Sequence, residues 1–388
     1  MRRVYLDHAA TTPVDPEVAL LMATVLRDVP GNPSSIYAEG RQARALVDRA
    51  RHEVAAAIGA LPGEIVFTSG GTEADNLALR GVLGARAGQA DGLVTTAIEH
   101  HAVLDTARDL ALHAQARVMV IGVDPRGRVD PAAVRAAIDE RTALVSVMHG
   151  NNEIGTIQPI AEIGAICRER GVAFHSDAVQ TVGALEVDVR TLPVDLLSVN
   201  AHKFYGPKGV GALYVRSGTR IATIQTGGGQ EQGRRTGTEN VAGIVGLGAA
   251  LRIASSRRAA ESARQIELRD RLIAGIMAGI PDATLTGDPV DRLPNNASFC
   301  FNGTQGEALV VSLDLEGFSA SSGSACTSGD TEPSHVLLAL GLDRDLAQGS
   351  LRLSLGRATT GADIDALLAA LPPIVARLRV ASGVAVPA

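Results

Sequence analysis

The chain has 388 residues, of which 46% are hydrophobic and 20% are charged, and its formal net charge at pH 7 is −6. The composition is that of an ordinary globular protein, and the acidic balance argues against direct binding of nucleic acid or of an anionic membrane. The three cysteines are too few for a disulfide framework, and no apolar stretch is long enough to span a bilayer or to form a signal core. We therefore expect a cytoplasmic protein.

Short β-branched runs alternate with Ala-rich helical stretches over the first part of the chain. We expect seven strands, at residues 64–68, 93–96, 117–121, 143–148, 172–175, 195–199 and 210–215. Helices are expected between most of them, at residues 72–80, 102–113, 131–139 and 160–170. This alternation predicts an α/β fold whose mostly parallel sheet carries helices on both faces, with functional residues at the carboxyl ends of its strands.

The pattern changes around residues 245–275, which form a long Ala/Leu/Arg helical stretch. After it we expect a strand at 297–301, a helix at 306–315, a strand at 350–355 and a closing helix at 361–381. This order indicates a smaller α+β domain. We predict an N-terminal arm and large domain over residues 1–255, and a small C-terminal domain over residues 256–388.

Polar residues that follow two of the predicted strands carry the first chemical signal. Asp177 follows the strand at 172–175, and His202 and Lys203 follow the strand at 195–199. A lysine and an aspartate that converge on one ring are what pyridoxal phosphate (PLP) requires, for a Schiff base and for the pyridinium nitrogen. By itself, Lys203 fits a solvated surface lysine better, because lysine is rarely buried.

Three further segments follow predicted strands. Gly70, Gly71 and Thr72 form a glycine turn at a helix start, which suits a phosphate but also a simple helix cap. His100 could stack on a cofactor ring and exchange protons. Asn152 lies in a polar cluster that could place amides over a ligand or only form a turn.

Cysteine and histidine positions indicate where other chemistry could occur. Cys326 lies in a Ser/Gly-rich loop sequence, where a thiol can be activated as a thiolate, whereas Cys167 and Cys300 are expected in the core. The pair His100-His101 is a weak metal motif, because adjacent side chains diverge, and His175-Ser176-Asp177 is weaker still. We expect no metal in the isolated chain.

Taken together, these segments resemble the cysteine desulfurases of the NifS/IscS-like class, which are fold-type I PLP enzymes of the class-V aminotransferase family. The resemblance extends from residue 5 to about residue 360, with the matching segments in the same order. The segments are 5–13, 68–73, 151–155, 177–180, 202–203, 227–231, 237–240, 321–327 and 351–354.

The resemblance implies a homodimer that takes sulfur from L-cysteine, releases L-alanine and leaves a persulfide on Cys326. Lys203 would be the Schiff-base lysine, Asp177 would pair with the pyridine nitrogen, and His100 would stack on the ring and move protons. The remaining implied cofactor contacts are Gly71, Thr72, Asn152, Gln180, Asn200, His202 and, toward the partner subunit's phosphate, Thr238. Arg352, with Asn152, would hold the substrate, and its guanidinium suits a carboxylate.

Two places depart from the family pattern. Asn200 stands where a phosphate-contacting serine is usual, and Gln225-Thr226 precedes the triple glycine in place of the usual His-Gly. The sulfur acceptor is left open among an iron–sulfur scaffold, a tRNA-thiolating enzyme and other carriers. Two other interpretations of the chain also stay open: another fold-type I PLP enzyme, such as an aminotransferase or a selenocysteine lyase, and a non-enzymatic binding protein.

Overall fold

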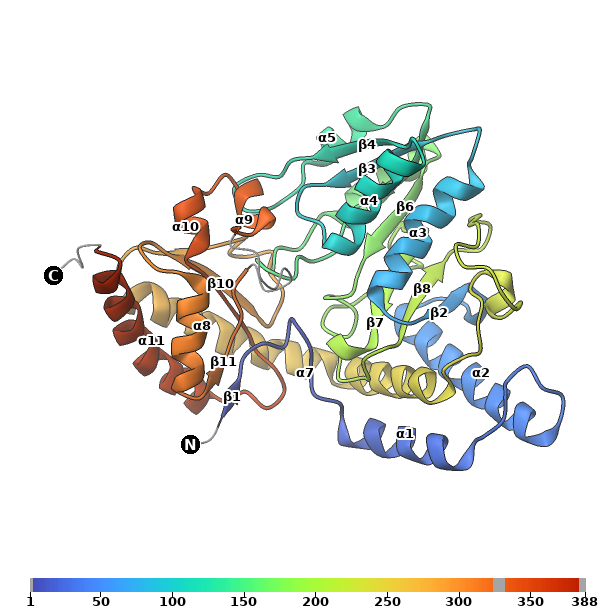
Figure 1. The fold of residues 1–388 in the computed structure, drawn as a ribbon, viewed down its shortest axis with the longest axis horizontal. Coiled ribbons are helices and arrows are strands. Elements are labelled where there is room, and N and C mark those ends of the chain that lie inside the picture. The colour runs from blue at the N-terminus through green and yellow to red at the C-terminus, as the bar shows by residue number, and fades with distance from the viewer. Residues whose placement is uncertain (1–2, 324–331, 384–388) are drawn as a thin grey trace.

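The computed structural model describes residues 3–323 and 332–383 of the chain (Figure 1). Its centre is a seven-stranded sheet with the strand order β2-β8-β7-β6-β5-β3-β4. The strands are β2 (Ile65–Thr68), β3 (Gly92–Thr96), β4 (Arg117–Ile121), β5 (Thr142–Ser146), β6 (Ala173–Asp177), β7 (Leu196–Asn200) and β8 (Gly211–Val215). Strand β8 is antiparallel to both of its neighbours, and the other pairs are parallel. The predicted α/β fold with a mostly parallel seven-stranded sheet is confirmed.

Helices cover both faces of this sheet, because its buried strands alternate apolar side chains between two cores. Leu196 and Leu213 join the core under α3 and α4, whereas their neighbours Leu197 and Tyr214 join the core on the other face. The helices are α1 (Pro16–Asp28), α2 (Ala38–Ile58), α3 (Gly71–Ala85), α4 (His101–His113), α5 (Pro131–Ala137) and α6 (Ile160–Arg170). Helices α1 and α2, which the sequence analysis did not name, pack against α7 (Val241–Gly279).

The C-terminal part of the chain builds a second, smaller layer of sheet and helix (Figure 1). Its antiparallel sheet has the order β12-β10-β9, and a short parallel pair joins β1 to β11. The strands are β1 (Val4–Tyr5), β9 (Ala283–Leu285), β10 (Asn296–Phe301), β11 (Phe318–Ser319) and β12 (Ser350–Ser354). The helices are α8 (Gly306–Leu315), α9 (His335–Ala339), α10 (Arg344–Gln348) and α11 (Gly361–Ala381).

Helix α7 joins the two parts, as Figure 1 shows. Its N-terminal half, up to Ala254, belongs to the core of the large sheet, and from Leu268 it packs in the core of the small sheet. This change supports the predicted division near residue 255, which stays a prediction. The start of the chain crosses the same division, because β1 pairs with β11 before the chain enters α1.

Among residues 3–323 and 332–383, no helix combines the length and the apolar character that crossing a membrane requires.

Candidate active site

A cavity of about 370 Å³ lies where the carboxyl ends of the large-sheet strands meet the N-terminal arm and β12. Ten of the residues singled out from the sequence line it, although they come from widely separated parts of the chain. They are Gly71, Thr72, His100, Asn152, Asp177, Gln180, Asn200, His202, Lys203 and Arg352. The parallel sheet explains this convergence, since the residues after β2, β3, β5, β6 and β7 emerge at one edge.

The N-terminus of α3 opens onto one end of this cavity. Its N-cap residue is Gly70, which offers no side-chain acceptor, so the first-turn N–H groups can meet an anion. A Cβ on Gly71 would lie 2.9 Å from Val179 Cγ2 and 3.3 Å from Asn200 Nδ2, so a close approach requires glycine here. The N–H groups at the start of α3 therefore make this end of the cavity suitable for a phosphate group.

Asp177 ends β6 on the floor of the cavity and is buried. Its Oδ1 accepts the Val179 N–H at 2.9 Å. Burial raises its pKa to about 6, while this hydrogen bond and the nearby Lys203 ammonium act in the opposite direction. A protonated ring nitrogen beside it would hold this carboxylate in its charged form.

Lys203 ends the short 3₁₀ helix η2 (Ala201–Lys203) that follows β7. Its ammonium donates to the carbonyl oxygens of Ala9 at 2.6 Å and of Ala10 at 2.8 Å. Gln180 Nε2 donates to the same Ala9 oxygen at 2.9 Å. The N-terminal arm therefore supplies backbone acceptors that hold the lysine at the cavity.

His100 caps α4, and its Nδ1 accepts the Ala102 N–H at 3.1 Å. An N–H must donate, so Nδ1 is unprotonated and the ring proton lies on Nε2. Burial, and then the positive charge of Lys203, lower the His100 pKa to about 4. The imidazole is therefore neutral near pH 7.

Arg352 lies in β12 and is only 4% exposed. Its Nη2 donates to Asp7 Oδ1 at 2.8 Å and its Nη1 to the Asn152 carbonyl oxygen at 3.1 Å. Its buried Nε has no partner among the described residues. The guanidinium is thus fixed at the cavity wall with donor capacity left for a carboxylate.

One of the predicted site residues that the structure describes, Thr238, is not among those that line the cavity. Thr238 is exposed, on the loop between η3 (Glu231–Gly233) and α7. Cys326 lies outside the described residues. Cys167 and Cys300 are buried, as predicted, and burial raises the pKa of each thiol to about 12.

Acidic side chains near the cavity were missed by the sequence reasoning. Asp7 lay inside the matching segment 5–13, but nothing in its spacing indicated a contact with Arg352. Burial raises the pKa of Glu99 to about 8, and burial together with the charge of Asp177 raises that of Asp75 well above its ordinary value. No group of three or more His, Cys, Asp or Glu side chains within the described ranges could hold a metal ion.

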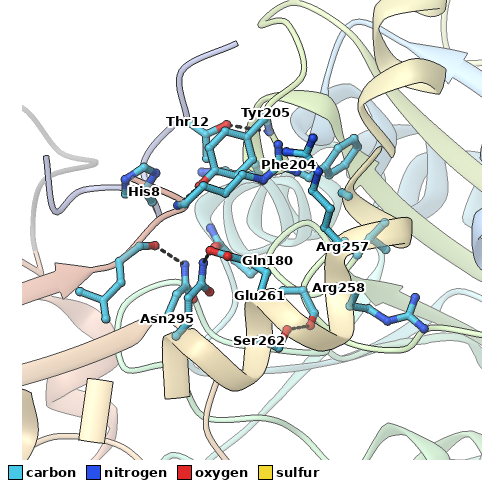
Figure 2. Close-up of a pocket in the computed structure, with 18 residues that line it drawn as sticks. His8, Thr12, Gln180, Phe204, Tyr205, Arg257, Arg258, Glu261, Ser262 and Asn295 are labelled. Atoms are coloured by element: carbon cyan, nitrogen blue, oxygen red, sulfur yellow. Dashed lines mark hydrogen bonds between the residues drawn. The ribbon is translucent and has the colours of Figure 1, made fainter. Parts of the chain in front are cut away.

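A second, much smaller cavity of about 50 Å³ adjoins the first and shares Gln180 and Lys203 with it (Figure 2). Arg257, Glu261 and Ser262 of α7 face it from one side, and Tyr205 and Thr12 from the other. Tyr205 lies 3.9 Å beneath the Arg357 guanidinium, and its hydroxyl accepts the Arg357 N–H at 2.7 Å. This space is too small for a cofactor and forms a polar junction between the arm and α7.

The model of the family Aminotransferase class-V matches residues 4–367, and the chain belongs to this family. Cysteine desulfurase IscS of Clostridium botulinum is 48% identical over 380 residues, which are 97% of this chain and 96% of that protein.

Solved structures show the same relationship. A NifS-like protein superposes with a TM-score of 0.90 at 37% identity, covering 97% of this chain and all of that one. A structure of SspA in complex with cysteine has a TM-score of 0.80 at 34% identity, covering 91% of this chain and 98% of that one. The predicted resemblance to the cysteine desulfurases is confirmed.

Proposed function

We propose that this chain is a PLP-dependent cysteine desulfurase that takes sulfur from L-cysteine, releases L-alanine and leaves a persulfide on Cys326. One observation carries the proposal: a single cavity gathers ten residues that the resemblance assigned to cofactor and substrate, in a chain that matches IscS desulfurases along nearly its whole length. The related protein SspA forms a complex with cysteine, which supports the choice of substrate.

The residues present fit the cofactor. The N-terminus of α3, with Thr72, Asn200 and His202, would take its phosphate. The Nδ2 of Asn200, which lies beside Gly71, can donate where the family usually has a serine hydroxyl. Asp177 would face the ring nitrogen and His100 one face of the ring, while Gln180 and Asn152 would face its oxygen substituent. When bound, PLP supplies an electron sink for the substrate's Cα carbanion.

Arg352 would bind the substrate carboxylate. It is rigidly placed by Asp7 and by the Asn152 carbonyl, and a planar guanidinium suits a carboxylate geometry. The substrate carboxylate must share Arg352 with Asp7, because the negative charge of Asp7 offsets part of the positive charge of the guanidinium. This arrangement favours a small amino acid with a single carboxylate.

The side chains of this protein would then divide the proton transfers. Lys203, once released from the Ala9 and Ala10 carbonyls, removes the Cα proton as an amine. The Cys326 thiolate forms an S–S bond to the substrate sulfur as the substrate's Cβ–S bond breaks, with that bond's electron pair left on carbon. His100 presents its Nε2 proton toward the cavity, and protons returned at Cβ and Cα complete L-alanine.

The proposal includes two protein partners and a place in the cell. The exposed apolar side chains Leu20 and Leu26 on α1, and Ile36 in the segment that follows, would be covered in a homodimer. Thr238, exposed and away from its own cavity, would reach the phosphate bound in the partner subunit. A sulfur-acceptor protein, an iron–sulfur scaffold or a tRNA-thiolating enzyme, would take the persulfide sulfur in the cytoplasm.

The test is an anaerobic incubation of the PLP-loaded protein with L-cysteine, in which alanine and the mass of the Cys326 peptide are both measured. We expect alanine to form together with a sulfur adduct on that peptide. The Cys326→Ala variant should keep the cofactor absorbance and its change on cysteine addition, but should form no persulfide. Full turnover in that variant would remove Cys326 from the reaction, and formation of a keto acid by the wild type would instead indicate an aminotransferase.

A further inference from the structure

Glu153 is a buried acid that the assigned roles leave unused, although it directly follows Asn152 of the cavity wall. It is 6% exposed. Its N–H donates to Asn151 Oδ1 at 2.8 Å, and its carbonyl oxygen accepts from Asn296 Nδ2 at 3.1 Å. The backbone of this turn is therefore fixed from two sides. Burying a carboxylate costs free energy unless the group is paired, so the position of this side chain in the interior calls for an explanation.

Its carboxylate lies between residues on the two sides of the segment that carries Cys326. Ser334, after that segment, donates its hydroxyl to Glu153 Oε2. Gly323, before it, lies close to the same oxygen, since even a Cβ added at that position would come within 3.2 Å of Oε2. The Gly323 N–H is bound in turn to Ser350 Oγ, at 3.1 Å.

The Ser334 hydroxyl that donates to Glu153 also caps a helix. It accepts the Val336 N–H at 3.1 Å and so caps α9. Its single proton is therefore directed at Glu153, and the start of α9 cannot shift without breaking that bond.

The same acid is linked to the substrate-binding arginine. Burial raises the pKa of Glu153 to about 7, while the hydrogen bond from Ser334 and the positive charge of Arg352 act in the opposite direction. Arg352 Nη1 is bound to the carbonyl of Asn152, the preceding residue of the same turn. One turn therefore contacts the predicted carboxylate site on one side and Ser334, next to Gly323, on the other.

We propose that Glu153 is a positioning residue that fixes Ser334, and with it the neighbourhood of Gly323, relative to Arg352, and that the rate of sulfur transfer to Cys326 depends on this placement. This inference rests on the proposed function. It adds to that function a residue that acts on sulfur transfer rather than on binding of the cofactor or the amino acid.

The test separates binding from transfer in a single turnover of the PLP-loaded protein with L-cysteine. The change in cofactor absorbance reports cysteine binding, and the mass of the alkylated Cys326 peptide reports persulfide formation. In Glu153→Ala we expect the absorbance to change at the same cysteine concentration as in the wild type. Persulfide formation should be slowed about tenfold or more, because small misplacements of reacting groups are costly. Glu153→Gln, whose amide oxygen still accepts from Ser334, should stay within about threefold of the wild type.

Ser334 provides a second pair of variants, in case Glu153→Ala does not fold. Ser334→Ala should slow persulfide formation and Ser334→Thr, which keeps the hydroxyl, should restore it. The double variant Glu153→Ala/Ser334→Ala should be no slower than the slower single variant, because both remove one contact. Asp288→Asn, a buried acid of the small part that lies outside the cavity, is the matched control and should leave the rate unchanged.

Each outcome has one meaning. Persulfide formation at the wild-type rate in both Glu153→Ala and Ser334→Ala would overturn this inference and leave the desulfurase proposal standing. Additive slowing in the double variant, or loss of cysteine binding in step with the rate, would overturn it as well. Absence of persulfide and alanine in the wild type would instead overturn the proposed function.

Discussion

The pair of Asp7 and Arg352 is the residue-scale feature with the most direct bearing on substrate binding. Asp7 is a hydrogen-bond acceptor that orients the guanidinium, but it is also an anion that competes with the substrate carboxylate. The two effects can be separated, because asparagine keeps the acceptor and removes the charge.

We therefore expect Asp7→Asn to lower the KM for L-cysteine about fivefold, because a charge-assisted hydrogen bond exceeds a neutral one by about 1 kcal/mol. Its kcat should not rise. Asp7→Ala, which also loses the acceptor, should raise KM. Steady-state alanine production at a series of cysteine concentrations measures both constants, and an unchanged KM in Asp7→Asn would show that Asp7 does not compete with the substrate.

Glu99 gives a residue-scale prediction for stability. Burial raises the pKa of Glu99 to about 8 in the folded protein. The protonated side chain therefore stabilises the fold fully at a pH below the pKa of Glu99 in the unfolded chain, and this stabilisation is lost as the pH rises toward 8. Glutamine does not titrate. Relative to the wild type, Glu99→Gln should gain up to about 1.4 kcal/mol in the free energy of unfolding per pH unit between about pH 5 and 8.

Urea unfolding of both proteins at pH 5, 6.5 and 8 measures this difference. A constant difference for Glu99→Gln would mean that the Glu99 pKa is not raised in the folded protein.

At the scale of elements, the sequence predicted most of what positions the site. Strands with β-branched runs between glycine turns could be located, and from them the common edge where Asp177, His100 and Lys203 meet. The reversed direction of β8 could not be predicted, because it depends on the path of its connections rather than on its own pattern. The short helices α9 and α10, of five residues each, are too brief for a periodic signal.

The N-terminus of α3 permits a direct test of the phosphate site. Gly71→Ala places a Cβ 2.9 Å from Val179 Cγ2 and 3.3 Å from Asn200 Nδ2, so the first turn must move away from Val179 and Asn200. We expect the dissociation constant for PLP to rise about tenfold or more, with little change in the melting temperature of the PLP-free protein. Gly122→Ala, where a Cβ meets nothing within 4 Å, is the control in an absorbance titration with PLP. Equal PLP affinities for the wild type and both variants would show that the phosphate does not bind at the N-terminus of α3.

At the scale of the whole molecule, the arm and β12 could be joined to the site only through the family resemblance. Asp7 and Arg352 are far apart in the chain and meet because β1 pairs with β11 and because Asp7 bridges to Ser354 at the end of β12. Neither contact leaves a local pattern in the sequence. The same holds for Thr238, whose predicted role depends on a second copy of the chain.

A homodimer with shared sites can be tested by mixing two defective variants. Lys203→Ala and Thr238→Ala should each be impaired, but their heterodimer contains one site that has both wild-type residues. We expect mixing under subunit-exchange conditions to recover up to about half of the wild-type activity per such dimer. No recovery despite exchange would show that Thr238 serves its own subunit, and a monomer in sedimentation would refute the dimer.

The placement of β1 has a consequence for how this protein is made. Ribosomes release the N-terminal arm first, yet its partners β11, Arg352 and Ser354 are synthesised last. The anchor that Asp7 provides for Arg352 is therefore completed only when translation is nearly finished. An unfinished chain should be unable to hold the substrate carboxylate at Arg352, so competence for the reaction belongs to the end of biogenesis.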